Sequence, residues 1–197
     1  MDRAEPTLRV ATPADAEPIQ ALMKASAAGL FPAFYNDRQV ESGIQFVADV
    51  DQLLLTDGTY YVLEAAGEAV ACGGWSRRAR PYTGSGDSGT DDRVLDPATE
   101  AAHVRAMFTR PDWTRRGLGR RIIARCEVDA AAQGYHRLDL LATLSGVPLY
   151  VACGFVATGP QYEISLLDGT PMECVPMSKP IEATVATTVA ESTLALR

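Results

Sequence analysis

The spacing of apolar residues divides the N-terminal part of the chain into one strand and two helices. Residues 8–12, Leu-Arg-Val-Ala-Thr, predict a short strand. A helix is expected over residues 13–29, with Asp15 in its first turn and Gly29 at its end. Apolar residues then recur at near-helical spacing over residues 37–55, and this predicts a second helix.

A β-hairpin and a long polar loop are expected in the middle of the sequence. Residues 60–65 and 70–75 are rich in β-branched and aromatic side chains, and residues 66–68 between them predict the turn. The segment over residues 78–99 is rich in Gly, Ser, Asp and Pro and has few large apolar side chains. We therefore expect a mobile surface loop there.

The remaining pattern predicts a strand, a helix, a strand, a short helix and a final hairpin. The first strand covers residues 101–109, and the helix after it begins at Gly117 and ends at Gly134. One face of that helix is apolar: Leu118, Ile122, Cys126 and Ala130. The later elements are a strand over residues 136–144, a helix over residues 146–154 and a hairpin that turns at Asp168-Gly169. Strand, helix and strand in this order indicate locally parallel strands.

Length and charge narrow the class of protein. The 197 residues, of which 47% are apolar, suit a single α/β domain. We assign the domain to residues 1–180 and leave residues 181–197 as a tail of unknown structure. The net charge of −7 argues against a nucleic-acid-binding surface, which is usually basic, and is compatible with a cationic small-molecule substrate.

Metal binding and membrane insertion are both unexpected. Cys72, Cys126, Cys153 and Cys174 form no Cys-x-x-Cys pair and lie in apolar segments, so they are expected to be reduced core thiols. With only two histidines in the chain, we expect no metal site. The charged N-terminus resembles no signal peptide, and no apolar run is long enough to span a bilayer. A cytoplasmic protein is therefore expected.

Glycines and arginines meet where the strand over residues 101–109 leads into the next helix. Arg115 and Arg116 precede Gly117-Leu118-Gly119, and Arg120 follows. Backbone N–H groups at a helix N-terminus attract anions, glycines allow close approach, and arginines add charged donors. The stretch predicts a pyrophosphate-binding site, and taken alone it also fits a solvated basic helix start. It is neither a Walker A motif nor a dinucleotide-binding fingerprint.

Two motifs together resemble the GNAT N-acetyltransferase superfamily. Residues 114–119, Thr-Arg-Arg-Gly-Leu-Gly, are similar to the family's Gln/Arg-x-x-Gly-x-Gly/Ala pattern at a strand-to-helix junction. Downstream, "LYVACGF" is similar to the family's Leu-Tyr-x-x-x-Gly-Phe helix. Two departures are visible: Thr114 stands where Gln or Arg is usual, and Ser145 stands near a frequent Asn.

The resemblance implies both the fold and the cofactor site. The fold would be α/β of the α+β type, a single GNAT-like domain whose mixed central sheet splays between strands four and five and is flanked by helices. Acetyl-CoA would lie in that opening as co-substrate, without a metal. The implied cofactor-binding residues are Phe108, Thr109, Arg115, Arg116, Gly117, Leu118, Gly119, Arg120 and Ser145.

The resemblance also implies the chemistry. A primary amine would attack the thioester directly, and Tyr150 would act as the general acid that protonates the departing thiolate. A phenol suits this role because its pKa of about 10 is comparable to that of a thiol. The base is left open between Glu64 and His103, with Asp139 as a third candidate.

The acceptor side is the least defined part of the sequence. Aromatic residues could line an acceptor pocket that holds a cation or an aromatic amine, or could simply cover the edge of the core: Phe31, Phe34, Tyr35, Trp75 and Tyr162. We expect a small-molecule amine as acceptor, and the protein could form a homodimer. The alternative function is a non-catalytic sensor or regulator that binds acyl-CoA, and a nucleotide-binding protein ranks third.

Overall fold

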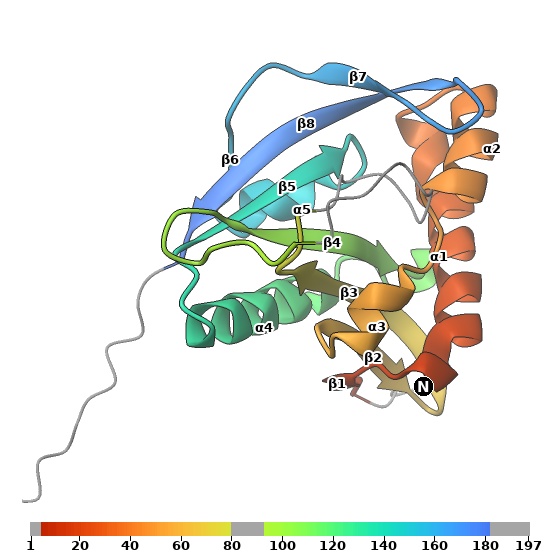
Figure 1. Ribbon diagram of the computed structural model, residues 1–197. Coiled ribbons are helices and arrows are strands. Elements are labelled where there is room, and N and C mark those ends of the chain that lie inside the picture. Colours follow the sequence, from red (N-terminus) through yellow and green to blue (C-terminus); the bar gives the residue numbers. More distant parts are fainter. Residues whose placement is uncertain (1–4, 80–92, 182–197) are drawn as a thin grey trace, which may run out of the picture.

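The computed structural model describes residues 5–79 and 93–181, which form an eight-stranded mixed sheet between two helical layers (Figure 1). The strand order is β1-β2-β3-β4-β5-β8-β6, and β7 pairs with β8. The strands are β1 (Thr7–Val10), β2 (Tyr60–Ala65), β3 (Glu68–Ser76), β4 (Ala102–Thr109), β5 (Arg137–Thr143), β6 (Val156–Ala157), β7 (Tyr162–Ser165) and β8 (Pro171–Pro180). The helices are α1 (Ala16–Leu30), α2 (Asp37–Phe46), α3 (Gln52–Thr56), α4 (Leu118–Ala132) and α5 (Val147–Ala152).

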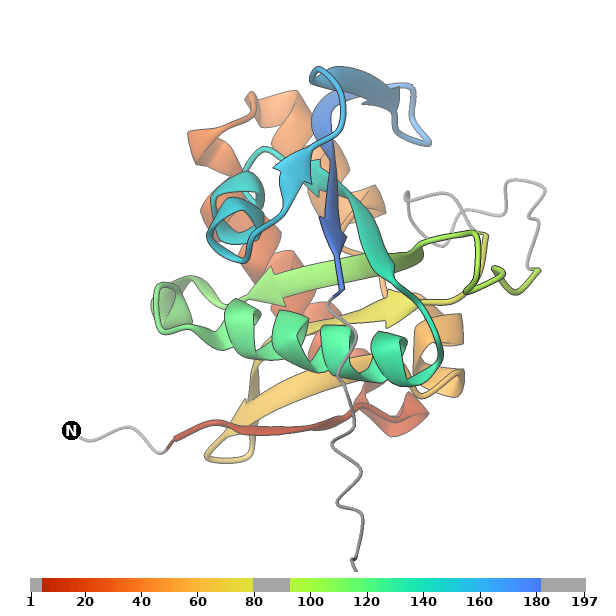
Figure 2. The same cartoon turned by 90° about the vertical axis from the view of Figure 1, so that its left-hand side faces the viewer.

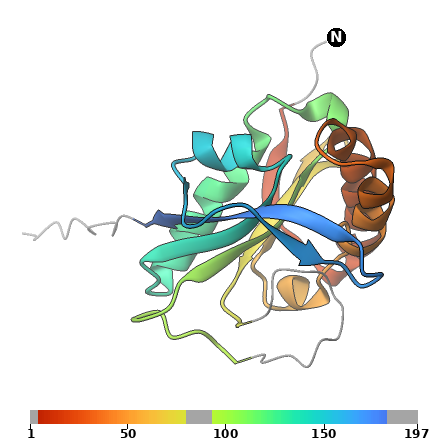
Figure 3. The same cartoon turned by 90° about the horizontal axis from the view of Figure 1, so that it is seen from above.

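Helices cover both faces of the sheet. Seen from the side, α4 runs along one face (Figure 2), and seen from above, α1 lies on the face opposite α4 and α5 (Figure 3). Each face has its own buried cluster. The α4 side includes Trp75, Val104, Ile122, Ile123 and Leu138. The α1 side includes Ile19, Met23, Leu54, Tyr60 and Met172. The apolar face predicted for α4 is confirmed, because its four residues are buried in the first cluster.

The sheet opens between β4 and β5, as the resemblance implied. These parallel strands pair only through Ala102 with Leu138 and His103 with Asp139. Beyond that point β5 continues to pair with β8 along its whole length, whereas β4 stays with β3. The edge of β4 over residues 104–109 therefore faces an opening instead of a neighbouring strand.

A bulge interrupts β4 inside this opening. Ala106 has a φ of 50°, and the β3–β4 register shifts between Cys72 and Gly74. Val104 and Met107 both pack on the α4 side although they are three positions apart, so the bulge changes the face to which the following side chains point. The hydroxyl of Tyr60 donates to the Ala106 carbonyl at 2.6 Å and holds the bulge from the opposite side.

Two helix predictions were wrong. Gly29 does not end α1, which continues to Leu30; a Cβ at Gly29 would clash with the Pro111 ring, so the glycine serves close packing against the loop after β4. The single helix expected over residues 37–55 is two helices, because the chain breaks at residues 47–51 and restarts at an Asp51 N-cap.

The hairpin turn is shorter than predicted, and the predicted loop and tail lie largely outside the described residues. The hairpin turn has two residues at positive φ, Ala66 at 52° and Gly67 at 81°, and Glu68 already belongs to β3. Most of the loop expected at residues 78–99 lies outside the described residues, since positions 80–92 are not among them. The same is true of residues 182–197 in the predicted tail.

Candidate functional site

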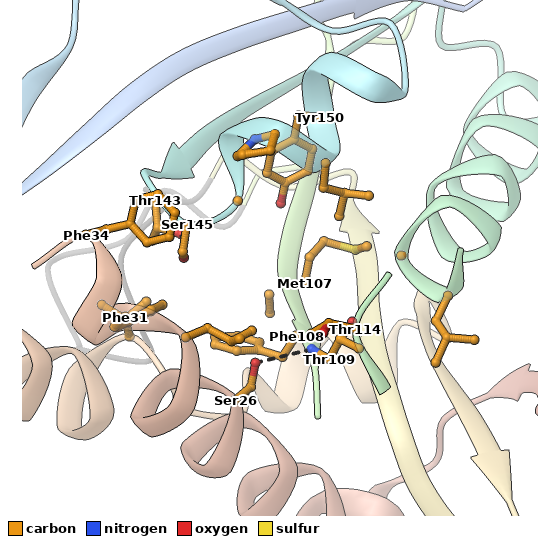
Figure 4. Close-up of a pocket in the computed structure, with 18 of the residues that line it drawn as sticks. Ser26, Phe31, Phe34, Met107, Phe108, Thr109, Thr114, Thr143, Ser145 and Tyr150 are labelled. Carbon is orange, nitrogen blue, oxygen red and sulfur yellow. Dashed lines mark hydrogen bonds between the residues drawn. The ribbon is translucent and has the colours of Figure 1, made fainter. Parts of the chain in front are cut away.

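A cavity of about 730 Å³ lies in the opening between β4 and β5. The end of α1, the edge of β4, the start of α4 and the helix α5 all contribute to its wall. Figure 4 shows Phe31 on the α1 side, Met107 and Phe108 on the β4 side, and Tyr150 across from them on α5. The volume falls in the range of pockets that bind small molecules.

The loop before α4 has a backbone suited to an anion. Arg115 has a φ of 62°, and Gly117, the N-cap of α4, has a φ of 77°. Successive N–H groups in such a turn form an anion-binding concavity, and the helix dipole adds positive potential. An ideal Cβ at Gly117 would meet no atom within 4 Å, so the space beside the turn is open.

The arginines of this loop take different positions. Arg115 and Arg120 line the cavity, and Arg116 is not among the residues of its wall. The Arg116 guanidinium instead lies 4.7 Å from the centre of the Trp113 ring and donates to the Asp112 carbonyl at 3.3 Å. The loop therefore offers two arginines to a ligand in the cavity, where the sequence had suggested three.

Gly119 lies where the glycine-rich loop before α4 packs against α5, the helix of the second sequence motif. A Cβ at this position would lie 2.7 Å from Cδ2 of Leu149 on α5. The absence of a side chain thus lets the start of α4 pack against α5, and both elements contribute to the same cavity. Leu118, the buried residue before it, also lies in the cavity wall.

Tyr150 lies on α5 with its hydroxyl directed into the cavity (Figure 4). The side chain is buried, and this burial raises the pKa of its phenol above the ordinary value. Its ring needs the glycine before α5, because a Cβ at Gly146 would lie 3.0 Å from Cε2 of Tyr150. A protonated phenol is therefore held in the cavity at neutral pH.

The remaining predicted cofactor residues also lie at the cavity. Phe108 and Thr109 line it from β4, and Ser145 lines it from the turn before α5. Ser145 shares a hydrogen bond of 3.1 Å with the Thr143 hydroxyl. The N–H of Thr109 donates to the Ser26 hydroxyl on α1 at 3.3 Å, so that backbone donor is engaged within the protein.

The predicted bases lie away from the cavity wall. Glu64 accepts hydrogen bonds from Arg9 on β1 at 3.0 and 3.2 Å. His103 lies where β4 and β5 are still paired, and burial, followed by the charge of Arg105, lowers its pKa. Asp139, the third candidate, accepts from Ser178 at 2.6 Å. None of the three is among the residues that line the cavity.

The predicted aromatic wall is only partly assembled. Phe31 and Phe34 line the cavity, and 45% of Phe34 is exposed. Trp75 faces the α4 layer and is therefore fully buried in the core, away from the cavity. Its indole N–H donates to the hydroxyl of Tyr61. Tyr162 lies exposed on β7, outside the cavity wall. Tyr35 is buried beside Phe31 and does not line the cavity.

Sequence reasoning missed three charged residues of the cavity wall. Asp49 and Asp51 lie in the linker between α2 and α3, and Arg105 lies on β4 just before the bulge. The available signals were the capping position of Asp51 and a charged residue in the middle of a strand that is otherwise apolar. The first signal was hidden by the expectation of one continuous helix over residues 37–55.

The cysteines, the possible metal ligands and the helices were each compared with the sequence predictions. All four cysteines are free, and burial raises the pKa of the Cys174 thiol, which lines the cavity, to about 12. Within residues 5–79 and 93–181, no group of three or more His, Cys, Asp or Glu side chains is arranged to bind a metal ion. None of the helices found there has the length and apolar character needed to span a bilayer.

Sequence comparison gives a family match for the segment that contributes β4, α4 and α5 to the cavity wall. Residues 94–176 match the sequence model of a family described as acetyltransferase (GNAT) domain. They include the β4 edge, the loop before α4 and the helix α5. No curated protein matches the chain in sequence.

Solved structures show the same fold over nearly the whole chain. A GCN5-related N-acetyltransferase from Rhodopseudomonas palustris superposes with a TM-score of 0.68 at 21% identity, covering 91% of this chain and 98% of that one. The PaiA N-acetyltransferase from Thermoplasma acidophilum, solved with coenzyme A, gives 0.61 at 12% identity over 89% and 98%. YncA from Salmonella typhimurium, described as a putative acetyltransferase and solved with acetyl-CoA, gives 0.59 at 17% identity over 95% and 100%.

Proposed function

Because residues 94–176 match the acetyltransferase (GNAT) family model and the chain shares the fold of solved N-acetyltransferases, we propose that it transfers an acetyl group from acetyl-CoA to a primary amine by direct attack. One observation carries the proposal. The open edge of β4, the positive-φ turn at Gly117 and the hydroxyl of Tyr150 meet at a single cavity. Each has a separate use in this reaction, and a protein that only packs its core needs none of them there.

The cavity fits acetyl-CoA in charge and shape. The turn of Arg115 and Gly117 would hold the pyrophosphate, with the arginine side chains of the loop as additional donors. The edge of β4 at Phe108 and Thr109 would lie along the pantetheine arm. Ser145 lies on the opposite wall of the cavity and offers a hydroxyl. Acetyl-CoA supplies the activated acetyl group, and the protein supplies binding, orientation and a proton.

Tyr150 would donate that proton. Its phenol is protonated at neutral pH because burial raises its pKa. A thiolate leaving group takes a proton as the bond between carbon and sulfur breaks, and a protonated hydroxyl beside the sulfur can provide it. The direction of the hydroxyl, which points into the cavity, supports this role (Figure 4).

Direct attack by the amine is favoured over an acetylated protein. Cys174 is the cysteine found in the described cavity wall, and the residue is 2% exposed. With a pKa of about 12 it stays protonated at neutral pH, which makes it a poor nucleophile. The amine must therefore reach the thioester itself.

The acceptor is proposed to be a small molecule. Phe31 and Phe34 give the cavity an aromatic wall, and its volume suits a small amine beside the cofactor arm. A cytoplasmic location and a homodimer stay predictions from the sequence.

A thiol-release assay with acetyl-CoA and a panel of amines tests the proposal. An acetyltransferase releases free CoA in proportion to added amine. The second candidate, a sensor that binds acyl-CoA without chemistry, would bind acetyl-CoA in calorimetry and release no thiol with any amine. Tyr150 in the cavity favours the enzyme, because a sensor has no use for a proton donor there.

A further inference from the structure

Two segments far apart in the sequence form the wall of the cavity across from the proposed pyrophosphate site. Figure 4 shows Phe31 and Phe34 on one side of the cavity, and Thr114 of the loop before α4 on the other. One segment is the connection between α1 and α2 with the C-cap of α2, and the other is the hairpin of β7 and β8. We call their cavity-lining residues the far wall: Phe31, Phe34, Val47, Ile164, Met172 and Cys174.

The tip of the β7–β8 hairpin extends beyond the end of β5. The pairing of β5 with β8 ends at Thr143 and Cys174, and residues 171–173 of β8 pair with β7. Strand β7 in turn pairs with β8 and lies off the main strand order. A two-stranded ribbon is marginally stable by itself. Contacts other than strand pairing must therefore hold the tip of this hairpin in place.

A row of side-chain hydrogen bonds joins the hairpin to α2, which lies beside its tip (Figure 1). In this polar row the donors lie over residues 35–42 and the acceptors over residues 168–173. Gln39 makes two of the bonds, since its Nε2 donates to the Pro171 carbonyl and to Oε2 of Glu173, both at 2.8 Å. The others run from the Tyr35 hydroxyl to the Glu173 carbonyl at 2.8 Å, from the Ser42 hydroxyl to Oδ1 of Asp168 at 2.9 Å, and from Nε of Arg38 to Oγ1 of Thr170 at 3.3 Å.

Gln39 is the central residue of the polar row. It is 8% exposed, and both N–H groups of its amide donate to the hairpin. Its Oε1 accepts the backbone N–H of Asn36 at 3.1 Å, which completes the capping box of α2. A buried amide held at three points keeps one orientation, because leaving any of these groups without a partner is costly. Gln39 therefore fixes the separation between α2 and the hairpin.

The far wall rests directly on the same face of α2. An ideal Cβ at Gly43 would lie 2.9 Å from Cε2 of Phe31 and 3.5 Å from Cε of Met172, so both wall residues pack against the helix. Ile164 lies opposite Met172 in the hairpin register, and both side chains line the cavity. A movement of the hairpin away from α2 would therefore move this part of the wall.

We infer that the polar row limits the size of the acceptor, and that Gln39 is the positioning residue on which this limit depends. The row holds Ile164 and Met172 at the cavity, so the space beyond the thioester admits an amine with a small, apolar body. The inference rests on the proposed function and names the size class of the acceptor at the same site. It predicts selection for 2-phenylethylamine over 2-(biphenyl-4-yl)ethylamine, which has the same aminoethyl group and one more ring.

Gln39→Glu removes the bonds to the hairpin and keeps the helix cap. A glutamate has the same length and can still accept the Asn36 N–H, because Glu and Gln both serve at this position of a capping box. It loses both donors and places a carboxylate beside the Pro171 carbonyl and the Glu173 carboxylate. The matched control is Gln45→Glu, the same change at an exposed position of α2. The rescue is Gln39→Glu combined with Glu173→Gln, because the new amide at position 173 can donate to the new carboxylate.

Calorimetry on the full chain, saturated with CoA, measures binding of the two amines without reaction. The wild type should bind 2-phenylethylamine at least about tenfold more tightly than the biphenyl amine, because the second ring would have to displace packed side chains. Gln39→Glu should reduce this preference at least about threefold, Gln45→Glu should keep it, and the double variant should restore most of it. Affinity for CoA should stay within about twofold throughout, because Gln39 bonds to the hairpin and to α2.

Hydrogen exchange gives a second measurement that needs no ligand. The N–H of Leu166 bonds to the Thr170 carbonyl at 2.9 Å in the hairpin turn, and it should exchange faster in Gln39→Glu than in the wild type or in Gln45→Glu. If Gln39→Glu does not fold, Ser42→Ala, which removes the bond to Asp168, takes its place in both measurements.

The wild type failing to prefer the smaller amine, including binding of neither amine, would overturn the inference. An unchanged preference in Gln39→Glu would overturn it as well. The failure of the proposed function has a different signature: no thiol is released from acetyl-CoA with any amine, whereas the calorimetric preference needs no turnover.

Discussion

The phenolic oxygen of Tyr35 accepts a hydrogen bond from the backbone N–H of Leu144 at 2.7 Å. The same hydroxyl donates to the carbonyl of Glu173 on β8 at 2.8 Å. Tyr35 lies in the connection between α1 and α2 and thus links the end of β5 to β8. The link lies where β5 ends and the turn that contains Ser145 begins. The sequence placed Tyr35 in the acceptor wall; the structure gives it this bridging position outside the cavity lining.

We expect Tyr35→Phe to loosen the turn before α5. The change leaves a backbone donor and a backbone acceptor without this partner, which should cost about 1–3 kcal/mol of unfolding free energy. It should also raise the KM for acetyl-CoA with less effect on kcat, because Ser145 and α5 belong to the cofactor side. Urea denaturation and steady-state kinetics measure both effects.

Tyr162→Phe is the matched control for this substitution. Tyr162 is 46% exposed on β7, and its hydroxyl should contribute little to either quantity. Equal stability and equal KM in the two variants would remove the bridging role from Tyr35.

Gly117→Val should weaken CoA binding strongly. The position has a φ of 77°, which a β-branched residue adopts only with strain, and the new side chain would occupy the open space beside the anion-binding turn. Calorimetry with CoA should show a loss of at least about tenfold, since the turn supplies several backbone donors at once.

Gly58→Val provides the control for backbone strain. Gly58 has a φ of 69° and, like Gly117, no atom within 4 Å of an ideal Cβ, but it is not among the residues of the cavity wall. Both variants should lose stability to a similar degree, and only Gly117→Val should lose affinity. A parallel loss of CoA binding in both would show that the effect is general destabilisation. Gly119 is unsuitable for this test, because its side chain would collide with Leu149.

Arg120→Ala should weaken CoA binding more than Arg116→Ala. Arg120 lines the cavity, whereas Arg116 packs over Trp113 and bonds to the backbone of the same turn. An exposed charge contact is worth about 1 kcal/mol or less, so the loss for Arg120→Ala should be roughly threefold to fivefold. Arg116→Ala should stay within about twofold. Calorimetry at two salt concentrations would measure both, and the reverse order of effects would contradict the assignment.

Tyr150→Phe should lower kcat and leave acetyl-CoA affinity nearly unchanged. The ring keeps its packing against Phe155, and only the proton donor is lost. A positioned general acid contributes about 10²–10⁴-fold, so the loss of turnover should fall in that range. An acyl donor with a more acidic thiol should reduce the loss, because its thiolate needs less help. A variant with wild-type kcat would exclude Tyr150 from the chemistry.

The alkaline side of the pH profile gives an independent view of Tyr150. Burial raises the pKa of this phenol above the ordinary value of about 10, so the protonated, proton-donating form persists at higher pH than for a free tyrosine. With both substrates saturating, kcat should therefore not fall between about pH 7 and pH 9.5 through loss of this proton. A fall below about pH 9 that disappears in Tyr150→Phe would contradict the raised pKa.

Local signals predicted the helices and strands around the loop before α4 well. The strand before the loop, the apolar face of α4 and the short helix α5 each depend on residues within a few turns of one another. The glycines of the loop also act locally, through the positive φ of Gly117 and the close approach of Gly119 to Leu149.

The acceptor side depends on contacts between segments far apart in the sequence. Asp51 and Arg105 meet only because the α2–α3 linker folds onto β4, and no periodic pattern encodes that contact. Trp75 shows the same limit, since its aromatic character suggested an acceptor wall but the pleat of β3 directs it to the α4 layer. The helix expected over residues 37–55 failed because apolar spacing continued through the break that places Asp51.

The most direct test of the central claim follows the acetyl group itself. The protein is mixed with acetyl-CoA that carries an isotopically labelled acetyl group, first alone and then with 2-phenylethylamine, and the protein, the amine and CoA are weighed by mass spectrometry. The account predicts no change in protein mass, labelled N-acetyl amine only when amine is present, and one free CoA for each acetyl group transferred. A labelled acetyl-protein that forms before any amine is added, or acetyl-CoA that stays intact with every amine tested although the protein binds it, would contradict direct transfer to an amine.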